Sequence, residues 1–92
     1  ADTPMPAADA APAPAPLARR ADRTLADQLA GRYAEHIRQR LIAPGARLPS
    51  VRACAARHGV SPATVVAAYD HLLAQGLIEA RRQRGFFVRA PS

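Results

Sequence analysis

Arginine side chains concentrate in one short segment of the chain, Arg81-Arg82-Gln83-Arg84-Gly85. The residues on either side of it, 77–78 and 86–88, are β-prone, which predicts a hairpin with this segment as its turn. Guanidinium groups without an acidic neighbour suit contact with a phosphate backbone or with the minor groove of DNA. The chemistry that this pattern predicts is therefore electrostatic binding of a nucleic acid.

Two short helices are expected before the basic hairpin. Ser50 can cap the first helix and Gly59 can end it in a left-handed conformation, which predicts a helix over 50–58. Ser61 then acts as a second cap, with Pro62 in the first turn, and predicts a helix over 62–75. Helices separated by so few residues must cross steeply, as in a helix-turn-helix that presents one helix to a DNA major groove.

A further helix is expected over residues 24–40. Thr24 and Asp27 form a capping-box-like start. Apolar residues then recur at four-residue intervals, at Leu25, Leu29, Tyr33, Ile37 and Leu41. This stripe predicts an amphipathic helix that packs across the other two. The expected fold is mainly α with a small β-hairpin: a winged helix-turn-helix of three helices and a two-stranded wing.

The core of this fold is expected to come from helix 62–75 and from the hairpin. The positions assigned to it are Val65, Ala68, Tyr69, Leu72, Leu77, Ile78, Phe87 and Val88. This assignment leaves Phe86 as the aromatic side chain expected on the surface. The outward face of the helix then holds Pro62, Ala63, Thr64, Ala67, Asp70 and His71.

Three strings in this region resemble the N-terminal DNA-binding domain of GntR-type bacterial transcription regulators. They are L-P-S-x-R from Leu48, G-V-S-x-x-T-V-x-x-A-Y-x-x-L-x-x-x-G-L-I from Gly59, and R-G-F-F-V from Arg84. The resemblance covers about residues 24 to 90. It implies sequence-specific binding of a double-stranded DNA operator by a cytoplasmic bacterial regulator that works as a homodimer in its full-length form.

The resemblance also assigns contacts with DNA to the two short helices. Arg52 matches an arginine that reaches a guanine in the major groove; its alternative role is a surface ion pair with Asp70 or Glu79. Ser61 and Thr64 match positions that contact DNA, although Ser61 is also needed as a cap.

Further contacts are assigned to the hairpin and to the turn before the first short helix. Arg84 and Gly85 match the wing tip, where a glycine lets the backbone approach the minor groove. Arg82 adds a guanidinium to the same turn, and Arg47 precedes the L-P-S turn, where it could contact a phosphate.

The recognition helix departs from the family pattern at two positions. Pro62 and Val66 stand where the family commonly has arginine. Both departures remove potential DNA contacts, so the resemblance does not define an operator sequence.

Two branches of the family share features with this chain. The Ala68-Tyr69 pair and the Phe86-Phe87-Val88 ending resemble the MocR-like branch, whose members carry a C-terminal aminotransferase-like domain that binds pyridoxal phosphate. That domain is absent from this chain, which has no lysine to form a Schiff base. The short YtrA-type branch is the alternative.

Composition separates an N-terminal tail from one domain. Residues 1–22 are rich in alanine and proline, which predicts a disordered tail followed by a winged helix-turn-helix over 23–90. Within residues 1–23 the charges cancel, with Asp2, Asp9 and Asp22 against Arg19, Arg20 and Arg23, so the net charge of +6 belongs to the domain.

We expect neither a signal peptide nor a membrane span. Because the chain starts without methionine and stops just past the wing, we expect a fragment, largely monomeric by itself.

Catalysis and metal binding are not expected, and no cofactor is expected in this chain. His36, His58 and His71 are assigned to separate surfaces, with no carboxylate cluster beside them. Cys54 is the single cysteine, so no internal disulfide can form, and it is expected in the core. No effector pocket is evident.

Two other kinds of partner remain as alternatives. A winged helix used for protein–protein contact should show an apolar rim rather than the arginines of the hairpin. A binder of RNA or single strands needs exposed aromatic platforms, and the sequence offers only Phe86.

Overall fold

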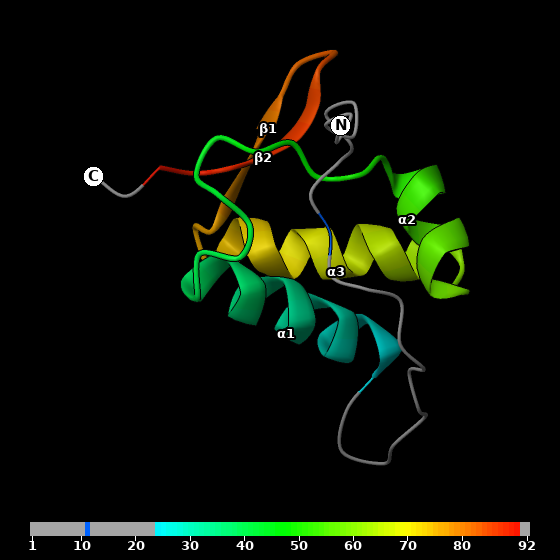
Figure 1. Cartoon of the computed structure of the whole chain (residues 1–92). Helices are drawn as coiled ribbons and strands as arrows, with labels where there is room; N and C mark the ends of the chain where they lie inside the picture. The colour runs from blue at the N-terminus through cyan, green and yellow to red at the C-terminus, as the bar shows by residue number, and fades with distance from the viewer. Residues whose placement is uncertain (1–10, 12–23, 91–92) are drawn as a thin grey trace, which may run out of the picture.

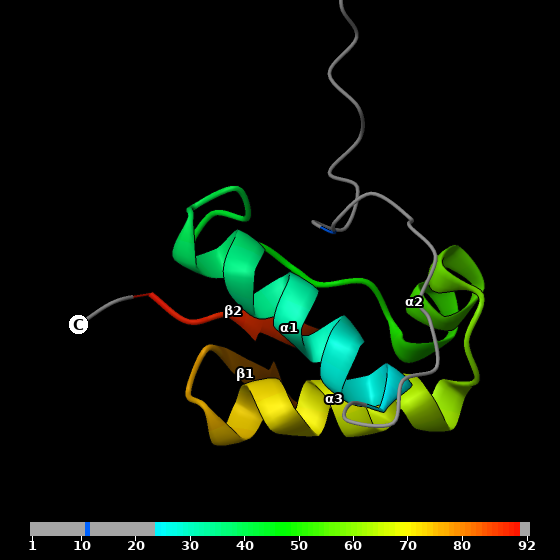
Figure 2. The same cartoon turned by 90° about the horizontal axis from the view of Figure 1, so that it is seen from below.

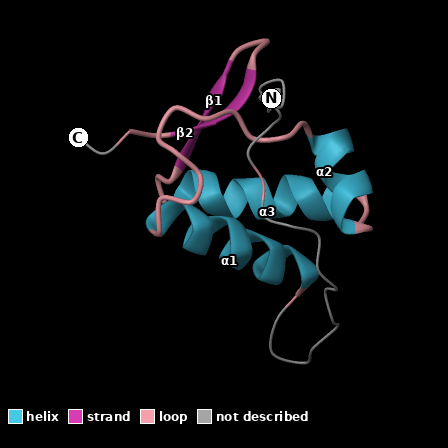
Figure 3. Ribbon diagram, in the orientation of Figure 1, coloured by secondary structure: helices cyan, strands magenta, loops and turns pink. Residues whose placement is uncertain are grey.

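A computed structural model describes residue 11 and residues 24–90. Its helices are α1 Leu25–Arg38, α2 Val51–His58 and α3 Pro62–Ala74, and its strands are β1 Ile78–Arg81 and β2 Gly85–Val88. α1 and α3 lie side by side, and α2 lies at one end of this pair. The hairpin projects away from the pair of helices (Figures 1 and 2). The expected winged helix-turn-helix is confirmed (Figure 3). The expected tail, residues 1–22, and residue 23 lie outside the described residues apart from Ala11.

The capping residues define the helix starts, as their types predict. Thr24 Oγ1 accepts a hydrogen bond from the Asp27 amide at 3.0 Å, and the Asp27 carboxylate accepts one from the Thr24 amide. Ser50 Oγ accepts from the Ala53 amide at 3.1 Å. Gly59 ends α2 with φ 66°, a left-handed conformation that costs glycine little. These local bonds satisfy backbone groups that a helix end would otherwise leave unpaired.

Four aromatic rings join the elements through the centre of the molecule. Tyr33 of α1 and Tyr69 of α3 are fully buried and meet edge to face, with ring centroids 6.0 Å apart. Tyr33 also meets the ring of His58 from α2, at 5.8 Å, and Tyr69 meets Phe86 of β2, at 4.9 Å. Edge-to-face pairs at these separations are favourable beyond the area that they bury. We call this set, His58–Tyr33–Tyr69–Phe86, the aromatic ladder.

The hairpin separates its side chains onto two faces by strand alternation. Its register pairs Ile78 with Val88, Glu79 with Phe87 and Ala80 with Phe86. Ile78 and Val88 are buried and Phe86 packs against the core. Phe87 therefore lies on the outer face, because successive side chains of a strand point to opposite sides. The expectation that Phe87 enters the core and Phe86 stays at the surface was wrong.

The apolar stripe of α1 ends earlier than expected. The helix stops at Arg38, and Arg40 follows with φ 60°, so the chain leaves the helical path. Leu41 is consequently 65% exposed, and the next residue, Ile42, is buried in its place. The four-residue interval could not predict this exchange, since it holds only while the helix continues.

His58 lies in the core rather than on a surface, contrary to the sequence-based assignment. Its side chain is 8% exposed, with Nε2 3.1 Å from the Tyr33 hydroxyl. Its Nδ1 has no hydrogen-bond partner among the described residues. Burial lowers the pKa of His58, and the charges of Arg57 and Arg32 lower it further. The folded state therefore favours the neutral imidazole.

We expect His58 to make stability depend on pH. Because its folded pKa lies below the unfolded value of about 6.5, the unfolded chain binds more protons in the acidic range. The stability that His58 contributes is complete above that value and is lost as the pH falls toward the folded pKa. Urea unfolding at a series of pH values should show a steeper acid loss for wild type than for His58→Gln. Equal pH slopes for wild type and His58→Gln would contradict the assignment.

Candidate nucleic-acid interface

Arg52 lies in the first turn of α2 on an exposed position. The turn before it is fixed from within, because the buried Tyr69 hydroxyl donates a 2.7 Å hydrogen bond to the Pro49 carbonyl. Among the described residues Arg52 has no ion-pair partner. Glu79, one of the partners considered for it, is bound to Arg81 instead. The guanidinium of Arg52 is therefore available to a ligand at the start of α2.

The hydroxyl groups at the start of α3 are bound to each other. Ser61 Oγ accepts from the Thr64 amide at 3.2 Å and lies 3.0 Å from Thr64 Oγ1. The structure therefore brings these two sequence-predicted site residues together and assigns Ser61 its capping role. Around them Pro62, Ala63 and Val66 are exposed, with Val66 at 47%. This part of α3 offers apolar contacts, of the kind that a thymine methyl group accepts, rather than charge.

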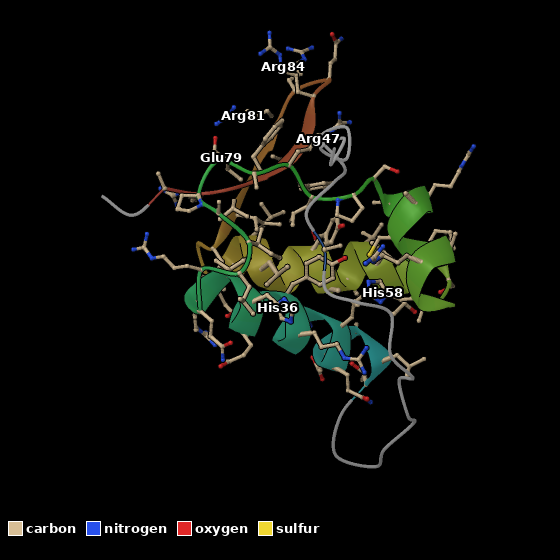
Figure 4. All side chains as sticks on the ribbon, viewed as in Figure 1. His36, Arg47, His58, Glu79, Arg81 and Arg84 are labelled. Carbon is tan, nitrogen blue, oxygen red and sulfur yellow. The ribbon has the colours of Figure 1, made fainter. Side chains whose placement is uncertain are left out.

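The tip of the hairpin carries Arg82 and Arg84. The turn closes with a 2.9 Å hydrogen bond from the Arg84 amide to the Arg81 carbonyl, and Gln83 has φ 63°. Both arginines are exposed and have no ion-pair partner in the described part of the chain. Arg84 lies at the end of the hairpin remote from the helices (Figure 4). The tip is thus a positive projection on a short, closed turn.

Arg81 differs from the arginines at the tip. It belongs to β1 rather than to the turn, and its Nε lies 3.2 Å from a carboxylate oxygen of Glu79. Its guanidinium carbon also lies 4.4 Å from the centre of the Phe87 ring. The ion pair offsets its charge, and the ring holds the side chain against the strand face. The Glu-x-Arg spacing on one strand face was the sequence signal for this pair.

Arg47 joins the outer face of the hairpin although it comes from the loop before α2. It forms an isolated antiparallel bridge with Phe87. A Cβ atom placed on Gly85 would lie 3.4 Å from Arg47 Nε, so the guanidinium runs directly beside this glycine. Gly85 also has φ 104°, which disfavours other residues. Arg47, Arg81 and Arg84 extend on the hairpin side of the molecule, whereas His36 and His58 lie on the helical side (Figure 4).

Other ligand chemistries find little support in the described residues. No group of three histidine, cysteine or carboxylate side chains could hold a metal there. Cys54 is buried, with its sulfur 3.4 Å from the Tyr33 hydroxyl. Phe86 packs on Tyr69 and Phe87 is covered by Arg81, so neither ring is a free stacking platform. No helix within residues 24–90 has the length and apolar character to cross a bilayer.

A protein-family model, described as bacterial regulatory proteins of the gntR family, matches residues 25–88. The chain is 36% identical over 69 residues to the HTH-type transcriptional regulator Rv1152 of Mycobacterium tuberculosis, a match that covers 75% of this chain and 57% of that protein. It is 46% identical over 61 residues to an uncharacterized HTH-type transcriptional regulator of Escherichia coli, YdcR, covering 66% of this chain and 13% of that protein. The chain thus spans about half or less of these relatives.

Solved structures of similar fold include a DNA complex. YtrA from Sulfolobus acidocaldarius, a GntR-family transcription factor, superposes with a TM-score of 0.75 at 29% identity, over 83% of this chain and 80% of that one. The DNA-binding domain of AraR in complex with operator ORX1 superposes with a TM-score of 0.65 at 28% identity, over 68% of this chain and 76% of that one. The fold is therefore one that binds an operator in a similar protein.

The occupied hydroxyl of Ser61 leads to a prediction about stability. Ser61→Ala should lower the free energy of unfolding by about 1 kcal/mol, because the Thr64 amide loses its cap. Ser61→Asp, which can still cap and adds a favourable charge at the helix start, should recover most of this loss. Thermal or urea unfolding would measure both. An alanine variant as stable as wild type would show that the cap contributes nothing.

Proposed function

The chain belongs to the gntR family of bacterial regulatory proteins, and we propose from this premise that it is the sequence-specific, double-stranded DNA-binding domain of a transcription regulator. The observation that carries the proposal is that Arg52, at the start of α2, and Arg82 and Arg84, at the hairpin tip, are exposed on a winged helix. Each is free of ion pairs within the described residues. Binding, not catalysis, is the activity proposed, and the cytoplasm, where bacterial DNA lies, is the proposed location.

Arg52 is proposed to read a base. It extends from the first turn of a helix whose start is held by the Ser50 cap and by the Tyr69–Pro49 hydrogen bond. A guanidinium fork can donate two hydrogen bonds to guanine O6 and N7 in the major groove. The start of α3 is proposed to add Thr64 and the methyl groups of Ala63 and Val66 to the surface that contacts the major groove beside Arg52. Ser61 contributes mainly by capping.

The hairpin is proposed to contact the DNA backbone and the adjacent minor groove. Arg82 and Arg84 supply charge at the tip, and Arg47 supplies it beside Gly85, where the lack of a side chain allows a close approach. Contacts of this kind set affinity and orientation, while base contacts set sequence preference. Arg81, which Glu79 and Phe87 restrain, contributes less.

The branch of the family is a narrower proposal. The Ala68-Tyr69 pair and the Phe86–Val88 ending support a MocR-like regulator, whose further domain would bind pyridoxal phosphate. The large share of YdcR outside the match leaves room for such a domain in that relative. A short YtrA-like regulator is the alternative, supported by the extensive superposition on YtrA. In either case we propose that the full-length protein acts as a homodimer and that this chain by itself is largely monomeric.

Binding to duplex DNA should weaken steeply with salt. Each phosphate neutralised by an arginine releases counterions, so the logarithm of the binding constant should fall with the logarithm of salt by about 0.9 per phosphate. Fluorescence anisotropy of a labelled duplex at several salt concentrations measures the slope. An affinity that does not change with salt would favour the alternative function, a winged helix that contacts a protein.

Arg52 and Arg84 should differ in how they affect specificity. Arg52→Ala should cost about 1–3 kcal/mol on the preferred site and much less on random DNA, as expected of a bidentate guanine contact. Arg84→Ala should weaken binding to both duplexes and reduce the salt slope, as expected of a phosphate or minor-groove contact. A selection from random duplexes would first supply the preferred site.

The matched control for both variants is Arg89→Gln, which removes a positive charge just after the hairpin. It should leave the preference between the two duplexes unchanged. Circular dichroism should show all three variants folded, because each side chain is exposed. An Arg52 variant that loses preferred and random binding equally would falsify the base-reading role and leave a phosphate contact.

A further inference from the structure

A second positively charged site lies at the ends of α1 and α3. A pocket of about 410 Å³ is lined there by the last turn of α1, the Gly76-Leu77 segment after α3, and the end of β2. The ends of α1 and α3 and the base of the hairpin lie together on the side of the molecule away from α2 (Figures 1 and 2). The pocket is therefore separate from Arg52 and from the start of α3. We call it the helix-end pocket.

Three arginines line the helix-end pocket, and no acidic residue joins them among its described lining residues. Arg38 is oriented by a 3.2 Å hydrogen bond to the Gln75 side chain. Arg89 is anchored by a 3.0 Å bond from its amide to the Leu77 carbonyl, and its guanidinium lies over Gly76. Arg40 has φ 60° and lies two residues after the end of α1. The three guanidinium groups thus come from the last turn of α1, the turn after it and the residue after β2.

The helix ends alone do not account for this charge. α1 and α3 both terminate at the pocket, and each C-terminus carries a partial charge of about −0.5. Together they offset roughly one of the three positive charges, which leaves an excess of about two. Arg40 and Arg89 have no ion-pair partner in the described part of the chain. An anion bound at the pocket would therefore offset the remaining positive charge of these exposed arginines.

The rest of the lining is apolar. Ile37 and Leu77 are partly buried and pack against the core, and Val88, the last residue of β2, is buried. The volume lies within the range of about 300–1,000 Å³ typical of small-molecule sites. An inorganic ion would leave these side chains facing water. An anion with an apolar body would cover them while its charged group reached the arginines.

The geometry points to the helix-end pocket as a binding site for a small organic carboxylate with an apolar body. The carboxylate accepts hydrogen bonds from Arg40 and Arg89, whose guanidinium forks match its two oxygens. The hydrocarbon part lies on Ile37 and Leu77. Because the site borders the ends of α1 and α3 and the hairpin base, its occupancy would stabilise the position of the wing against the helices. The site does not depend on DNA binding, and it supplies the effector pocket that no sequence pattern indicated.

The test is a titration of the complete 92-residue chain followed by amide NMR shifts, with 4-phenylbutyrate as the probe. We expect saturable shifts at Gly76, Leu77 and Arg89 with a Kd on the order of 1 mM, reasonable for a small fragment. 4-Phenylbutanol, which lacks the charge, and inorganic phosphate, which lacks the apolar body, should each bind at least about tenfold more weakly, or about 1.4 kcal/mol.

Variants separate a built site from a general attraction of anions. Arg89→Gln and Arg40→Asn should each weaken phenylbutyrate binding severalfold; asparagine tolerates the left-handed backbone at position 40. Arg84→Ala removes the same charge at the wing tip and should leave the titration unchanged. Equal binding of the alcohol or of phosphate, unaltered binding by Arg89→Gln, or shifts centred on the wing tip would each overturn the proposal. None of these results bears on DNA binding, which is measured without the probe.

Discussion

The structure depends on Tyr69 more than on any other side chain. Its ring lies at the centre of the aromatic ladder, in contact with Tyr33 and Phe86, and its hydroxyl donates to the Pro49 carbonyl. Burial raises its pKa, so it stays a neutral donor. One residue of α3 thus determines where α1, the hairpin and the turn before α2 lie. This hydrogen bond also holds the turn that places Arg52, because leaving the buried Pro49 carbonyl without a partner would cost free energy.

The arginines at the surface differ in what restrains their guanidinium groups. Arg81 is matched by Glu79 and covered by Phe87, so it stabilises the hairpin. Arg84 at the tip has no such partner within the described residues and remains available to a polyanion. The arginines of the helix-end pocket form a different class, since they surround an apolar floor on the side away from α2. The chain, with a net charge of +6, therefore has two separate positive surfaces, the hairpin tip and the helix-end pocket, and their chemistry differs.

Local signals in the sequence were sufficient for the starts of the helices, for the end of α2 and for the turn between α2 and α3. Ser50, Ser61 and Gly59 act through their own backbone neighbours, so their types alone predict where a helix starts or stops. The exposed positions of Arg82 and Arg84 follow likewise from a turn that closes on itself. The assignments of Phe87, Leu41 and His58 failed for a shared reason. Each depends on which face of an element meets the core, and periodicity cannot show this once the element bends or ends.

By itself the sequence determined the family, the order of the elements, the caps and the excess of arginine, because these are properties of neighbouring residues. Only the tertiary structure decided which charges are neutralised and which are left to a ligand. Arg47 and Gly85 lie far apart in the sequence yet side by side on the hairpin, and the end of α1 and the end of β2 bring arginines to one pocket. The physical reason is that Coulomb energy and burial depend on distance through space, which a chain acquires only when its core has packed.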